Sequence, residues 1–161
     1  MIGKVWFCYN VFVPVAFSCH CKSSVLLKEV IHIRKIVVSI LNGLLAEAIT
    51  TALNDSGEFQ TCRIQVSSRK SEAADSCRMM AADFILMEVA YAGGTSVETR
   101  LREAKEVLEA VPGCKIVFLC DENTSPDIAH EVTLAKKDGL IDGFFYSSVT
   151  TKYLLAALVS L

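Results

Sequence analysis

Short apolar runs rich in β-branched residues recur along the chain from residue 35 onward, and amphipathic segments separate them. The apolar runs predict strands at 35–40, 59–66, 83–89, 115–120 and 143–147. Apolar residues at helical spacing predict helices within 43–55, 70–81, 96–111, 121–139 and 149–161. Strands and helices that alternate five times, with no internal repeat, predict an α/β domain with a five-stranded parallel sheet and helices on both faces.

The segment 96–111 has the clearest helical pattern of the chain. Its predicted buried stripe consists of Val97, Leu101, Ala104, Leu108 and Val111. Thr95 and Glu98 have the spacing of a capping box, which predicts that the helix starts at Thr95. Further along, Ser125 is the predicted N-cap of a helix whose first position is Pro126.

Residues 1–32 differ from the rest of the chain. Their apolar stretch 5–19 is interrupted by Asn10 and Pro14, so it is too short and too broken to predict a membrane span. Small residues before Cys19 resemble an export signal, but Lys4 alone supplies the charged part of such a signal. We interpret 1–32 as an N-terminal extension outside the core of a domain at 33–161. An export signal and an over-extended start are the alternatives.

Composition excludes several classes of function. The chain has 161 residues, enough for one domain, and a net charge of −2, which gives no basic surface for nucleic acid. Its seven cysteines contain no CxxC pair, and Cys19, His20 and Cys21 lack a second ligand pair. We therefore predict no metal, no cofactor and no disulfide framework. Cys62, Cys114 and Cys120 are interpreted as core thiols of a cytoplasmic protein.

Three side chains mark the expected functional edge of the sheet. Glu88, Cys120 and Ser147 each stand at the carboxyl end of a predicted strand. Ligands of open parallel sheets bind at this edge, where the strand order reverses. We therefore predict that any site lies there.

The order, spacing and local motifs of residues 33–161 resemble the response-regulator receiver domain, which has a flavodoxin-like fold. The stretch ADFILMEVAYAGGTSVE resembles the strand, phosphate-accepting residue, loop and helix of that family. KIVFLC resembles the strand that ends in the switch residue. IDGFFYSSVTTKYLLAAL resembles the last strand, its lysine and proline, and the final helix.

The reactive positions implied by this resemblance are altered. The acid pair that would hold magnesium corresponds to Ile40 and Leu41, and moving the alignment by one residue finds only Ser39 and Ile40. The acceptor position holds Glu88, the switch position holds Cys120, and the lysine and its following proline are replaced by Ser147 and Ser148. Phe144 retains the aromatic residue used in signalling. The resemblance therefore implies a degenerate receiver, or pseudo-receiver, that is not phosphorylated on aspartate.

Glu88 has two interpretations at this stage. Its carboxylate imitates a permanently activated state, or it is a solvated acid at a strand end, the more common situation. The sequence shows no partner for its charge.

Two functions remain open. The first is a regulatory module of a signalling pathway that is not an enzyme and binds an unknown protein, or a second copy through the last strand and helix. Phe144, Tyr153 and Leu154 form its expected interaction face. The alternative is a ligand-binding or enzymatic domain that uses the strand-end crevice around Glu88, with Ser39, Asp121 or Ser147 as the second polar group. Neither implies contact with nucleic acid or membrane.

Overall fold

The structure, a computed structural model, describes residues 33–66, 72–91, 94–120 and 126–161. The predicted extension 1–32, the predicted cap Ser125 and the candidate Asp121 lie outside the described residues.

Five strands and five helices alternate along the described chain, as the apolar pattern predicts. The strands are β1 (Arg34–Ser39), β2 (Phe59–Ile64), β3 (Phe84–Val89), β4 (Lys115–Cys120) and β5 (Gly143–Tyr146). The helices are α1 (Gly43–Asp55), α2 (Glu72–Met80), α3 (Val97–Ala110), α4 (Pro126–Lys137) and α5 (Thr151–Ser160). The expected start of α4 at Pro126 is confirmed.

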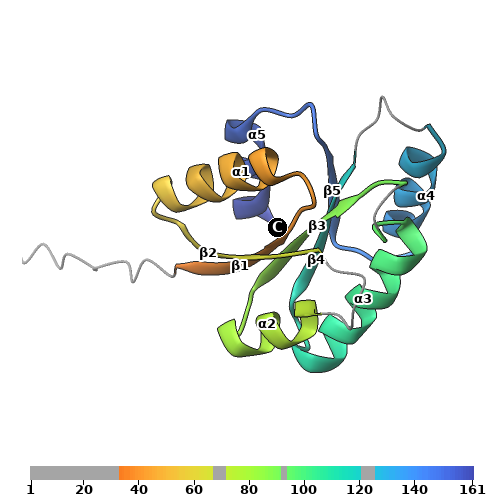
Figure 1. Cartoon of the computed structure of the whole chain (residues 1–161), viewed down its shortest axis with the longest axis horizontal. Helices are drawn as coiled ribbons and strands as arrows, with labels where there is room; N and C mark the ends of the chain where they lie inside the picture. Colours follow the sequence, from red (N-terminus) through yellow and green to blue (C-terminus); the bar gives the residue numbers. More distant parts are fainter. Residues whose placement is uncertain (1–32, 67–71, 92–93, 121–125) are drawn as a thin grey trace, which may run out of the picture. The chain divides into compact units, whose positions relative to one another are not determined.

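All strands are parallel and follow the order β2-β1-β3-β4-β5, which is a flavodoxin-like arrangement. Figure 1 shows α1 and α5 on one face of this sheet and α2, α3 and α4 on the other. The chain leaves β1 in one direction, to β2, and returns on the opposite side as β3. The carboxyl ends of β1 and β3 therefore form the switch point, where the sequence pattern predicted that any site would lie.

Helices cover both faces of the sheet. Side chains alternate between these faces along each strand, so both sets of side chains are buried. In β3, Phe84 and Leu86 pack toward α1 and α5, whereas Ile85 and Met87 pack toward the other three helices. These alternating positions explain why the sequence shows nearly continuous apolar runs rather than alternation.

The predicted stripe of α3 is wrong in part. The buried residues of this helix are Val97, Arg100, Ala104 and Val107, whereas Leu108 is 38% exposed. The predicted cap is also wrong by one residue, because the side chain of Ser96 accepts the N–H of Thr99. The buried face is therefore rotated from the predicted one, and it carries an arginine.

Within the described residues, no helix combines the length and the apolar character that a membrane span requires.

Candidate functional site

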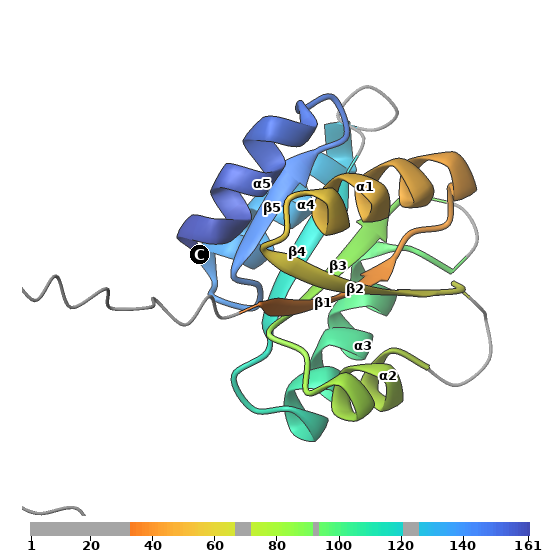
Figure 2. The same ribbon diagram turned by 90° about the vertical axis from the view of Figure 1, so that its left-hand side faces the viewer.

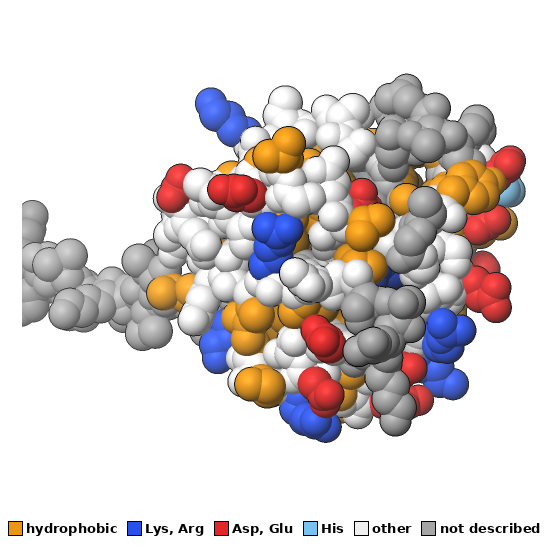
Figure 3. Space-filling view, viewed as in Figure 1, with side chains coloured by type: hydrophobic (Ala, Val, Ile, Leu, Met, Phe, Trp, Pro, Cys, Tyr) orange, Lys and Arg blue, Asp and Glu red, His pale blue; other side chains and the backbone are white. Residues whose placement is uncertain are grey.

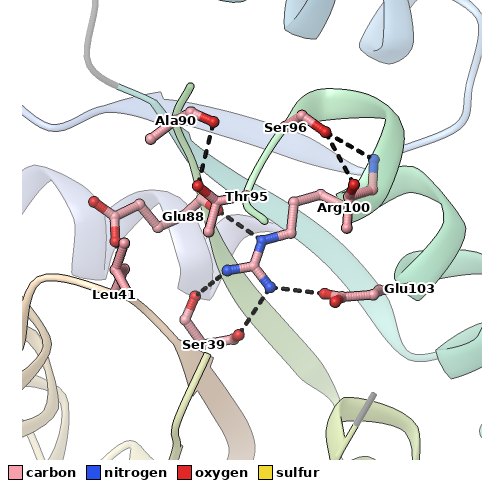
Figure 4. Close-up of polar contacts among 9 residues, drawn as sticks. Ser39, Leu41, Glu88, Ala90, Thr95, Ser96, Arg100 and Glu103 are labelled. Atoms are coloured by element: carbon pink, nitrogen blue, oxygen red, sulfur yellow. Dashed lines mark hydrogen bonds and ion pairs between the residues drawn. The ribbon is translucent and has the colours of Figure 1, made fainter. Parts of the chain in front are cut away.

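The carboxylate of Glu88 lies between β3 and the loop that follows β1 (Figure 4). Its Oε2 accepts the backbone N–H of Leu41 at 2.5 Å and that of Asn42 at 3.1 Å. Glu88 is half-buried and comes one residue after Met87, the last β3 residue that pairs with β1. The side chain therefore bridges the two strands where their backbone pairing ends.

The same loop begins α1 and has its own cap. Asn42 is the N-cap, and its Oδ1 accepts the N–H groups of Leu44 and Leu45. Glu88 and Asn42 together satisfy four N–H groups around the start of the helix, where orphan donors and the positive end of the helix dipole favour a carboxylate. The sequence showed no partner for the Glu88 carboxylate. In the structure its partners are the backbone N–H groups of Leu41 and Asn42.

A buried guanidinium group reaches the ends of β1 and β3 from the face of the sheet that α2, α3 and α4 cover. Arg100 of α3 is 1% exposed. Its Nε donates to the backbone oxygen of Glu88 at 2.8 Å, and its Nη2 donates to the backbone oxygen of Ser39 at 3.3 Å (Figure 4). Nη1 donates to Ser39 Oγ at 3.1 Å and pairs with Glu103 at 2.7 Å. One side chain thus links the ends of β1 and β3.

Two hydrogen bonds join Ala90, which follows β3, to Thr95, which lies just before α3. The N–H of Ala90 donates to the oxygen of Thr95 at 2.9 Å, and Thr95 Oγ1 donates back to the oxygen of Ala90 at 3.2 Å. Thr95 is fully buried. Although Thr95 does not cap α3, its two hydrogen bonds hold it next to Ala90, the residue that follows β3.

The acid-pair positions carry no oxygen ligand. Ile40 is 2% exposed and packs in the core beneath α1 and α5. Leu41 is 46% exposed, and its backbone contacts Glu88. Ser39, the alternative position, is buried and bound by Arg100. The described residues contain no group of three or more His, Cys, Asp or Glu side chains that could hold a metal ion.

Cys120 and Ser147, which the resemblance places at the switch and lysine positions, lie in different surroundings. Cys120 is buried, and its Sγ donates to the backbone oxygen of Phe145 at 3.6 Å. Ser147 and Ser148 are exposed, and the N–H of Ser147 donates to the oxygen of Cys120. The structure brings the ends of β3, β4 and β5 together, but the Glu88 carboxylate turns toward the loop after β1.

The predicted interaction face needs a correction at Leu154. This residue is 2% exposed because it packs under α5 against the sheet, so it cannot line an exposed face. Tyr153 is 60% exposed and makes an edge contact with the ring of Phe145. Phe144 is half-buried and stacks edge-on with Tyr146.

The cysteines predicted to be core thiols are buried at 114 and 120 and half-buried at 62, and none of the three forms a disulfide. Cys77 is buried next to Cys114. A hydrogen bond between the two side chains lowers the pKa of the Cys77 thiol, whereas that bond and burial raise the pKa of Cys114.

Sequence analysis missed Arg100, the most buried charged residue of the site. The only signal was its position three residues after Val97, on the apolar side of α3. An isolated arginine inside a charged helix is ordinarily assigned to the solvent.

No protein-family model matches this sequence, and no curated protein matches it by sequence. Solved receiver structures match its fold. The signal receiver domain of NarL from Mycobacterium tuberculosis superposes with a TM-score of 0.60 and 16% identity, covering 79% of this chain and 94% of that one.

Two further matches agree with the first. A LuxR-family DNA-binding response regulator from Staphylococcus aureus gives a TM-score of 0.61 and 10% identity over 79% of this chain and 97% of its own. Chemotaxis protein CheY4 from Vibrio cholerae gives 0.58 and 18% identity over 80% and 98%. These similarities establish the flavodoxin-like fold that the resemblance implied.

Proposed function

We propose that this domain is a pseudo-receiver: a cytoplasmic, non-enzymatic signalling module that acts through protein–protein contacts and does not depend on aspartyl phosphorylation. The single observation that carries the proposal is the engagement of the Glu88 carboxylate by the backbone N–H groups of Leu41 and Asn42. An acceptor must present a carboxylate oxygen to the incoming phosphoryl group in line with the leaving group. In this domain, Oε2 is directed into the loop after β1.

The surroundings of Glu88 support the same conclusion. Phosphoryl transfer requires cations that neutralise charge in the transition state. The family's magnesium ligands correspond here to Ile40 and Leu41, and its lysine corresponds to Ser147. Arg100 is the nearest buried cation that the described contacts reveal, but it binds Ser39, Glu103 and the backbone oxygen of Glu88. Ile40, Leu41 and Ser147 carry no positive charge, and the charge of Arg100 is directed to its own partners, so none of these four residues offers a cation to a phosphoryl oxygen.

The proposed contact surface includes the last strand and helix, through which a second copy or another protein would bind. Tyr153 is the exposed aromatic residue of that surface, with Phe144 at the sheet edge. Exposed aromatic residues are enriched where proteins bind one another.

An amide NMR titration of the full chain tests the proposal. Magnesium is added first, followed by magnesium with beryllofluoride, a phosphoryl mimic. We expect no saturable shifts around Glu88, Cys120 and Ser147, and we expect the same result for Glu88→Asp, because that variant still lacks the metal ligands and the lysine. Saturable shifts centred on these residues in the unmodified chain would refute the proposal and favour a ligand-binding site in the crevice.

A further inference from the structure

Two buried thiols lie against each other near the amino ends of β3 and β4, whereas Glu88 stands near the carboxyl end of β3. Cys77 of α2 and Cys114, just before β4, are 0% and 2% exposed. Both belong to the core cluster on the face of the sheet that α2, α3 and α4 cover, and both are free thiols. A hydrogen bond joins their side chains.

The end of α2 fixes the position of Cys77. Ala73 and Cys77 are the buried residues of this helix and lie about one turn apart, so they share its inner side. After Met80, Ala81 has a left-handed backbone with φ of 50°, and the N–H of Ala82 donates to the oxygen of Cys77 at 2.9 Å. In this Schellman arrangement, the second residue after the helix packs against the residue whose oxygen it binds. Ala82 is buried accordingly.

A turn after α3 brings Cys114 to the same place. The N–H of Cys114 donates to the oxygen of Val111 at 3.1 Å, and Gly113 between them has a φ of 99°, which glycine adopts without strain. The N–H of Lys115 then donates to the oxygen of Asp83 at 2.9 Å, so β4 starts alongside the residue that precedes β3. Cys114 therefore lies next to the end of α2, and Figure 2 shows α2 and α3 side by side.

The outer side of α2 covers the two thiols. Asp75 and Arg78 of this helix form an exposed ion pair, and Met79 is 87% exposed. Figure 3 shows charged and hydrophobic side chains over the lower part of the molecule, where α2 lies in Figure 1. A large reagent reaches the thiols only when α2 opens, whereas hydrogen peroxide, which has two heavy atoms, needs a much smaller opening.

We propose that Cys77 and Cys114 form a reversible oxidation site, at which hydrogen peroxide converts the two thiols to a disulfide. The sulfur of Cys77 attacks one oxygen of the peroxide, the O–O bond breaks, and the other oxygen leaves as water. The sulfur of Cys114 then attacks the sulfenic acid of Cys77, the S–O bond breaks, and the hydroxyl leaves with the proton of Cys114 as a second water. The two thiols lose two electrons, which reduce the peroxide, and an added dithiol reverses the cross-link by exchange.

The environment of each sulfur sets the order of these steps. The hydrogen bond from Cys114 lowers the pKa of Cys77 and so favours the thiolate that attacks peroxide. The same bond, burial and the negative charges of Asp83 and Asp142 raise the pKa of Cys114, which keeps its proton until the second step. Because the two side chains are already in contact, the second step needs no encounter, and it only shortens the separation of the sulfurs to about 2 Å.

The cross-link closes a loop that contains β3 and α3. A disulfide around a loop of this length restricts the unfolded chain, so we expect the oxidised protein to unfold about 10 °C above the reduced protein. Thermal unfolding followed by circular dichroism measures this shift, and dithiothreitol is expected to abolish it. The inference does not rest on the proposed function, because the thiols lie away from Glu88 and take no part in phosphoryl chemistry.

Mass spectrometry of the full chain tests the cross-link directly. The reduced, folded protein is treated with hydrogen peroxide at neutral pH, its remaining thiols are blocked with N-ethylmaleimide during unfolding, and it is digested without reductant. We expect a linked peptide that joins Cys77 to Cys114. Oxidised glutathione is expected to produce this link at least about tenfold more slowly, because both thiols are buried and this oxidant is far larger than peroxide.

Serine variants separate the two steps. Cys62→Ser is the matched control, because Cys62 is a half-buried free thiol of β2, and we expect it to keep both the link and the thermal shift. Cys77→Ser and Cys114→Ser are expected to lose both. In Cys114→Ser, Cys77 is expected to proceed to the sulfinic acid, since no second thiol captures its sulfenic acid. Circular dichroism of every variant checks that its fold is intact.

Three results would overturn the inference. They are Cys77 and Cys114 that stay reduced while Cys62 is oxidised, a link from either residue to a different cysteine, and a link that forms only after the protein is unfolded in urea. None of these results would change the beryllofluoride titration, so the pseudo-receiver proposal stands or falls separately.

Discussion

Glu88 accepts the backbone N–H of Leu41, and these are two of the residues that the resemblance to receivers singles out. The contact joins β3 to the start of α1 through a carboxylate and two N–H groups. Glutamate is longer than aspartate by one methylene, and this reach lets its carboxylate cross to the next strand. The Glu88 carboxylate therefore forms a structural link between the end of β3 and the loop after β1.

Glu88→Ala is expected to destabilise the domain by about 1 kcal/mol, the usual cost of removing a side-chain cap from helix N–H groups. Glu88→Asp is expected to lose part of the same stability because its carboxylate is shorter. Urea denaturation measures both. Glu47→Ala, an exposed acid of α1, serves as control and is expected to change stability by less than about 0.5 kcal/mol. Equal effects at the two positions would contradict a capping role for Glu88.

Arg100→Met is expected to destabilise the domain by about 3 kcal/mol or more. The substitution leaves the buried oxygens of Ser39 without their donor and Glu103 without its cation, and breaking a buried ion pair from one side carries that cost. Arg102→Met, at an exposed position two residues further along α3, is the control. Thermal and urea unfolding of both variants measure the difference, and similar losses in the two would show that Arg100 does not link β1 to β3.

Ser96→Ala is expected to cost about 1 kcal/mol because it removes the oxygen that accepts the N–H of Thr99 at the start of α3. Ser96→Asp is expected to retain the stability, since a carboxylate also caps and is favoured by the helix dipole. Chemical denaturation of the two variants is the measurement. An unchanged Ser96→Ala variant would move the cap to Thr95, where the sequence pattern placed it.

Among the described cysteines, Cys62 is expected to react first with iodoacetamide in the native protein at pH 8. Cys77 has a lowered pKa because Cys114 hydrogen-bonds to it, and a lower pKa by itself favours the reactive thiolate. Cys77 is nevertheless fully buried, whereas Cys62 is partly exposed on the edge strand β2. We expect access to outweigh pKa, and mass spectrometry of digested samples taken over time measures each rate. Faster labelling of Cys77 would show that α2 opens readily.

The sequence alone predicted every strand and helix of the described domain, the strand that carries Glu88 and the start of α4 at Pro126. These features depend on local periodicity and on turn residues, which are written directly in the order of residues. The resemblance to receivers also implied which positions carry altered side chains. Both the local periodicity and the resemblance are read from the order of residues alone.

Only the tertiary structure showed what Glu88 and Arg100 bind. Their partners are mainly backbone N–H and oxygen groups, which every residue possesses, so no side-chain pattern distinguishes them. The exposure of Leu154 and Leu44 could not be predicted from the sequence either. Both are leucines in amphipathic helices, and only packing decides that Leu154 is buried while Leu44 is exposed. The sequence determined the elements and their order; the packing of distant segments decided which polar groups are satisfied and which apolar side chains stay exposed.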